Sequence, residues 1–137
     1  MATYDQLPVY KATYDLLLTI FQVCQNMERD YKFTIGESLK KEKIELIVNV
    51  YRANSRHDKE AIIGTARENA EVIRLLLRLL KDLKQIELKR FVDMNIQLES
   101  ISKQLVAWQK KQKTTKTFEG ESRQGSFQEN LFGESAG

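Results

Sequence analysis

The chain has 137 residues, 42% of them hydrophobic, and its 22 Lys and Arg against 19 Asp and Glu give a formal charge of +3. This length suits one domain with a modest core, and so small a net charge does not by itself indicate an anionic partner. One cysteine excludes an internal disulfide, and no long apolar run or leader-like N-terminus predicts a membrane span or signal peptide, so we expect a cytoplasmic protein.

Helix-period hydrophobicity runs almost unbroken over residues 7–108 and separates into four segments. The first segment begins near Pro8, a residue tolerated in a first helical turn, and is expected to reach about Met27. Thr34-Ile-Gly-Glu37 then has the spacing of a capping box, in which each end residue satisfies an orphan backbone amide. A second helix is therefore predicted to start at Thr34 and to end near Ser55.

The third segment has the clearest pattern and is expected to run from a cap at Asp58 to about Lys84. Its main apolar stripe, at helical spacings, consists of Ile62, Ala66, Ile73, Leu76, Leu80 and Leu83. Four more residues widen the stripe to about 200°, beyond the roughly 100° of a surface helix: Val72, Leu75, Leu77 and Leu79. A helix with so wide a face is expected to be buried on two sides, and we predict a subunit interface at Val72, Leu75 and Leu79.

The fourth segment carries apolar residues at helical spacing, namely Leu88, Phe91, Leu98, Ile101, Leu105 and Trp108. Short polar links between helices of about 20 residues favour antiparallel neighbours. The predicted fold class is all-α, an up-down-up-down four-helix bundle over residues 1–111. Beyond Gln112 the chain is rich in Gly, Ser, Thr, Glu and Gln, which predicts a polar, flexible tail over residues 112–137.

Catalytic and metal chemistry is not indicated by the titratable residues. With only His57 and Cys24, one chain cannot supply the paired Glu-x-x-His motifs of a di-iron bundle, a Cys/His zinc site or a haem attachment motif. A glycine-rich phosphate loop is also absent. We expect a protein that is not an enzyme, with no catalytic residues, no metal and no cofactor.

A lane of cations occupies the third segment, on the side opposite its apolar stripe. Its members, at spacings of seven, four and three, are Arg67, Arg74, Arg78 and Lys81. Such lanes are usually solvated faces, and Glu71 and Asp82 are near enough to pair locally. The predominance of arginine, which suits phosphate geometry, favours a nucleic-acid surface instead. Further cations follow nearby, at Arg52, Arg56 and Lys59 and at Lys110, Lys111, Lys113 and Lys116. The residues alone leave a nucleic-acid surface and a pure protein-interaction bundle both open.

Four stretches of sequence resemble a known family. They are Leu-Pro-Val-Tyr-Lys-Ala-Thr-Tyr-Asp-Leu-Leu-Leu (7–18), Tyr-Arg-Ala-Asn-Ser (51–55), Arg-Leu-Leu-Leu-Arg-Leu-Leu-Lys-Asp-Leu-Lys (74–84) and Gln-Leu-Val-Ala-Trp (104–108). These stretches are similar to sequences of the four-helix-bundle family of accessory variability determinant (Avd) proteins. Proteins of this family accompany the reverse transcriptase of diversity-generating retroelements. A sister branch resembles proteins encoded in intervening sequences of bacterial 23S rRNA genes.

The resemblance implies a non-enzymatic accessory protein that assembles as a barrel-like homopentamer. It implies binding to a reverse transcriptase and to structured RNA of the template-repeat region, or to an RNA/DNA hybrid, in support of mutagenic cDNA synthesis. The family's binding surface is a distributed basic one, which we place on Arg52, Arg56, Arg74, Arg78, Lys81 and Lys84. The alternative is an oligomeric helical scaffold of the 23S rRNA intervening-sequence type without nucleic-acid affinity.

Overall fold

The computed structural model describes residues 7–127, with side chains as far as Thr114, and this part of the chain is helical without a strand. It contains four long helices and one single-turn helix, namely α1 (Pro8–Gln25), α2 (Arg29–Lys32), α3 (Ile35–Ser55), α4 (Lys59–Asp82) and α5 (Leu88–Phe127). The four predicted segments each form one long helix. The expected all-α, four-helix architecture is confirmed.

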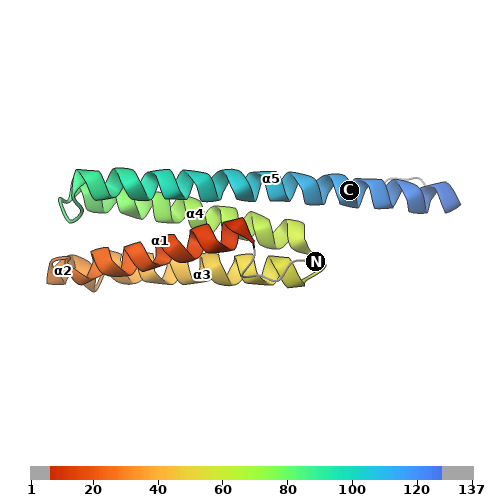
Figure 1. The fold of residues 1–137 in the computed structure, drawn as a ribbon. Helices are drawn as coiled ribbons and strands as arrows, with labels where there is room; N and C mark the ends of the chain where they lie inside the picture. Colours follow the sequence, from red (N-terminus) through yellow and green to blue (C-terminus); the bar gives the residue numbers. More distant parts are fainter. Residues whose placement is uncertain (1–6, 128–137) are drawn as a thin grey trace.

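The long helices run alternately up and down along one axis (Figure 1). In the bundle α3 packs against α1 and α4, and α5 packs against α4 and α1, so the helices occupy four corners in the order α1, α3, α4, α5. One end of the bundle, here called the loop end, holds the α3–α4 connection. The other, the turn end, holds α2 and the α4–α5 turn. None of the described helices is long and apolar enough to cross a bilayer.

The residues that α4 contributes to the core all lie on one side of this helix. The residues of α4 buried in it are Ile63, Ala66, Asn69, Ala70, Ile73, Leu77 and Leu80. The predicted stripe was therefore right at Ala66, Ile73 and Leu80. It was wrong in placing Leu76 in the main stripe and Leu77 only among the residues that widen it, because Leu77 is fully buried and Leu76 is only half-buried. Helical periodicity is ambiguous at three consecutive leucines. The packing of α4 between α3 and α5 determines which of the three side chains faces the core.

Both predicted N-cap positions are correct, yet neither side chain caps its helix. Thr34 and Asp58 are the N-cap residues of α3 and α4, and neither makes a side-chain capping hydrogen bond. The Thr34 hydroxyl donates instead to the carbonyl oxygen of Asp30, at 2.7 Å. The capping box is thus absent because α2 ends directly before α3 and offers Thr34 a carbonyl acceptor.

Helix α4 ends in a Schellman motif. The Gln85 amide donates to the Leu80 carbonyl at 2.8 Å, and the Lys84 amide donates to the Lys81 carbonyl at 2.9 Å. This motif needs a left-handed residue after the cap, a position usually held by glycine. Lys84 occupies it with φ of 62°, so a lysine bears backbone strain at this turn.

Replacing Lys84 by glycine is expected to stabilise the protein by about 1 kcal/mol, because glycine adopts the left-handed conformation without steric cost. The measurement is urea unfolding of Lys84→Gly beside Lys84→Ala, which removes the same charge and keeps the strain. Equal stability of the two variants would contradict the assigned backbone conformation.

Helix α5 continues to Phe127, past Gln112 where the tail is predicted to begin, and its far part extends beyond the other helices (Figure 1). Residues 128–137 and the side chains after Thr114 lie outside the described part. The division into a bundle over residues 1–111 and a tail over 112–137 remains a prediction.

Candidate nucleic-acid interface

The six cations predicted to bind nucleic acid do not form one patch. Arg52 and Arg56 are exposed at the loop end, where α3 finishes. Lys81 and Lys84 lie at the turn end, on the last turn of α4 and the residues after it. The 24 residues of α4 separate these groups by about 35 Å.

Arg74 cross-links two helices. Its guanidinium lies 3.2 Å from the Glu99 carboxylate of α5 and 3.4 Å from Glu71, and it donates to the Ser102 hydroxyl at 3.2 Å. The side chain is about one-third exposed. These interactions hold α4 against α5, so a change at Arg74 alters helix packing as well as surface charge.

The rest of the basic lane also borders α5. Arg67 donates to the Gln109 side-chain oxygen at 2.6 Å, and the Lys81 ammonium lies 5.2 Å from the centre of the Phe91 ring. Arg78 is exposed, and among the described residues it has no ion pair or hydrogen bond. The expectation that the lane points directly away from the core is therefore wrong, because three of its four members contact α5.

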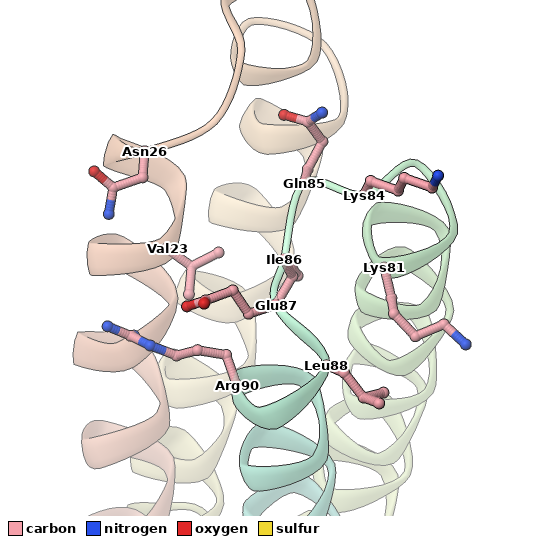
Figure 2. A pocket seen from close by; sticks show the side chains of 9 residues that line it. All are labelled: Val23, Asn26, Lys81, Lys84, Gln85, Ile86, Glu87, Leu88 and Arg90. Carbon is pink, nitrogen blue, oxygen red and sulfur yellow. The ribbon is translucent and has the colours of Figure 1, made fainter.

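Three predicted cations do gather near the turn end, at Arg78, Lys81 and Lys84, which we call the turn-end cluster. Figure 2 shows the Lys81 and Lys84 side chains pointing to the same side, away from α1. Lys81 is paired with Asp82 at 3.3 Å, whereas Lys84 is exposed. The cluster therefore contains two exposed cations and one cation that is partly neutralised by Asp82.

A hollow of about 660 Å³ lies beside the turn, between it and the end of α1. Figure 2 places Glu87 and Arg90 on the α1 side of the turn, across from the two lysines. Sequence reasoning missed Arg90, whose only signal was its place just after the chain reversal. Because Arg90 faces α1 and has Glu87 beside it, we do not add it to the cluster.

The turn is held in place by Gln85, a residue that sequence reasoning also missed. Its side-chain oxygen accepts from the Glu28 backbone amide at 2.9 Å, and its side-chain nitrogen donates to the Glu28 carboxylate at 3.1 Å. These bonds join the α4–α5 turn to the connection after α1. Lys84 is thus displayed on an anchored turn rather than on a loose loop.

A family model described as bAvd-like matches residues 8–112 of the chain. The chain belongs to the bAvd-like family. The match runs from the start of α1 into α5 and confirms the resemblance to Avd proteins of diversity-generating retroelements. None of the curated proteins matches the chain.

The bAvd-like bundle also buries a lysine that sequence reasoning missed. Lys43 of α3 is fully buried, and its ammonium lies 2.9 Å from the centre of the Phe21 ring of α1, with no hydrogen-bond partner in the described structure. Burial lowers the pKa of Lys43 from 10.5 to about 8, although the adjacent Cys24 thiol opposes the shift. Burial likewise raises the pKa of Cys24. The helical spacing of Leu39, Lys43 and Leu46 was the available signal.

The described part of this bAvd-like chain contains no group of three or more His, Cys, Asp or Glu side chains that could hold a metal ion. Lys43 lies under an aromatic ring rather than in one of the surface hollows. Its burial therefore bears on the stability of the fold.

Proposed function

We propose that this bAvd-like protein is a non-enzymatic accessory protein of a diversity-generating retroelement. In this role it binds a reverse transcriptase and structured RNA of the template-repeat region, or an RNA/DNA hybrid, and supports mutagenic cDNA synthesis in the cytoplasm. The observation that carries the proposal is the family match over residues 8–112. The predicted homopentamer is part of the same proposal.

The charge distribution supports a phosphate-binding role at the turn end. Arg78 and Lys84 are exposed there, while the side chains of Arg74 and Arg67 are engaged with α5. An oligomer repeats each exposed cation around its axis. Phosphate contacts that are individually weak would then add along one nucleic acid.

The test is a titration of a structured RNA with the full chain across a range of salt concentrations, together with retention of a retroelement reverse transcriptase. We expect affinity to fall log-linearly with salt, with a slope of about −0.7 to −0.9 per neutralised phosphate. The double variant Arg78→Gln/Lys84→Gln is expected to weaken binding and make the slope shallower. It leaves Arg74 in place, so the α4–α5 contact is kept.

Two comparisons make this result specific. Arg52→Gln/Arg56→Gln removes the same charge at the loop end, and Lys11→Gln/Lys41→Gln removes it at exposed lysines outside the predicted surface. A larger loss in the loop-end variant would move the interface to that end. Absence of RNA binding at low salt, or no retention of the enzyme, would argue against the proposal.

The alternative function is an oligomeric scaffold without nucleic-acid affinity. It is favoured by the formal charge of only +3 and by the engagement of Arg67, Arg74 and Lys81 with neighbouring side chains. A scaffold would retain a protein partner and show no salt-dependent RNA binding, and the turn-end variant would leave its activity unchanged.

A further inference from the structure

The turn between α4 and α5 places a charged residue where glycine is favoured. Lys84 is exposed and has φ of 62°, a left-handed conformation that only glycine adopts without steric cost. A strained residue persists only where the surrounding structure holds it, and such residues are concentrated at functional sites. What lysine supplies at this position, and glycine does not, is a cation at the end of a long side chain.

Two sets of hydrogen bonds hold the strained backbone. The first is the Schellman motif, in which the amides of Lys84 and Gln85 both donate to carbonyl oxygens of α4. The second comes from the Gln85 side chain. Its oxygen accepts from the Glu28 amide at 2.9 Å, and its nitrogen donates to the Glu28 carboxylate at 3.1 Å and to the Leu83 carbonyl at 3.2 Å. One side chain thus fixes the turn to a segment 57 residues earlier in the chain.

The side chains of Gln85 and Lys84 are directed differently. Figure 2 shows Gln85 pointing beyond the turn, toward the segment after α1 that contains Glu28, and Lys84 pointing away from α1. The Glu28 carboxylate accepts from Gln85, and Lys84 has no ion pair among the described residues. Gln85 therefore holds the backbone of the turn while the ammonium of Lys84 stays accessible to an anion.

The predicted subunit interface lies on another side of α4. Its residues Val72, Leu75 and Leu79 are all exposed. Lys81 follows Leu79 by two residues, so the two side chains lie about 160° apart around the helix. Lys84 points to the same side as Lys81 in Figure 2. An assembly formed through the three apolar residues would therefore leave Lys84 accessible.

We propose that Gln85 is a positioning residue for phosphate binding by Lys84. Its hydrogen bonds hold the left-handed turn, so the ammonium is displayed in a restricted region before RNA arrives. Ordering a mobile segment on binding lowers affinity, and a backbone that is already fixed avoids part of this cost. Gln85 contacts no phosphate itself in this arrangement. The inference rests on the proposed function, because it concerns how Lys84 meets RNA.

The test is a double-mutant cycle for the affinity of the full chain for a structured RNA. Gln85→Met removes the three side-chain hydrogen bonds without changing the charge, and Lys84→Gln removes the cation without introducing glycine. Gln85→Met alone is expected to weaken binding at least about threefold. Its salt slope should match that of the unmodified chain, because no cation is lost.

In the Lys84→Gln background, Gln85→Met should have no further effect on RNA affinity. An equal loss in both backgrounds would overturn the proposal, because a general distortion of the turn acts whether or not residue 84 is charged. Lys84→Gly, which is expected to stabilise the fold, should weaken RNA binding as Lys84→Gln does. Gln22→Met makes the same change as Gln85→Met at an exposed position of α1 and should leave affinity unaltered.

A second readout does not depend on RNA. Hydrogen exchange at the amides of Lys84 and Gln85 is expected to be faster in Gln85→Met, with exchange in the middle of α4 unchanged. Unchanged exchange at the turn would overturn the proposal, because Gln85 would then not hold it. If the unmodified chain binds RNA and Lys84→Gln binds it equally well, the positioning role is excluded and the proposed function stands. An unmodified chain that binds no RNA contradicts both.

Discussion

Replacing Leu77 with alanine is expected to destabilise the protein by about 3 to 4 kcal/mol, whereas the same change at Leu75 costs less than about 0.5 kcal/mol. Leu77 is fully buried between the helices, and truncation leaves a cavity that packed neighbours fill only in part. Leu75 is 66% exposed and loses little burial. The two leucines lie two residues apart on one helix, so local helix propensity is nearly the same in both variants.

Urea unfolding of the two variants measures this difference directly. It should be done at a concentration where the unmodified chain and both variants have the same oligomeric state, because Leu75 also lies in the predicted subunit interface and assembly contributes to apparent stability. A larger loss at Leu75 than at Leu77 under those conditions would mean that α4 is rotated relative to the described packing.

Replacing Lys43 with methionine is expected to stabilise the protein by roughly 2 to 3 kcal/mol at neutral pH. The ammonium is buried without a hydrogen-bond partner in the described structure, and methionine has a similar shape without charge. The pKa of Lys43 is about 8 in the folded protein against its ordinary 10.5, so the folded state binds fewer protons than the unfolded state between these values. Stability should therefore rise with pH across that window.

The stabilising effect of Lys43→Met is accordingly expected to be complete below about pH 8 and to shrink as pH rises toward 10.5. Unfolding curves across this range check both the sign and the window. Lys41→Met, at an exposed neighbouring position, is the matched control and should change stability by less than about 0.5 kcal/mol. A destabilised Lys43→Met would show that the ammonium contributes net favourable contacts in the core, such as that with the Phe21 ring.

Local sequence determined the secondary structure closely. Helical periodicity predicted the four long helices. The capping-box spacing at Thr34 and the candidate cap at Asp58 placed two N-caps at the correct residues, although neither side chain makes a capping hydrogen bond. The four stretches that resemble Avd proteins also predicted the family, which the family-model match over residues 8–112 confirms. These features depend on residues close together in the chain, and so they are readable without a structure.

Tertiary packing decided which side of each helix is buried and which cations remain exposed. Leu77 rather than Leu76 enters the core, Arg74 reaches Glu99 and Ser102 of α5, and Lys43 lies beneath the ring of Phe21. Each contact joins residues distant in the chain, so no local pattern encodes it. The sequence by itself thus determined the helices and the family, whereas the candidate surface depended on how α5 packs against α4 and on the turn that Gln85 anchors to Glu28.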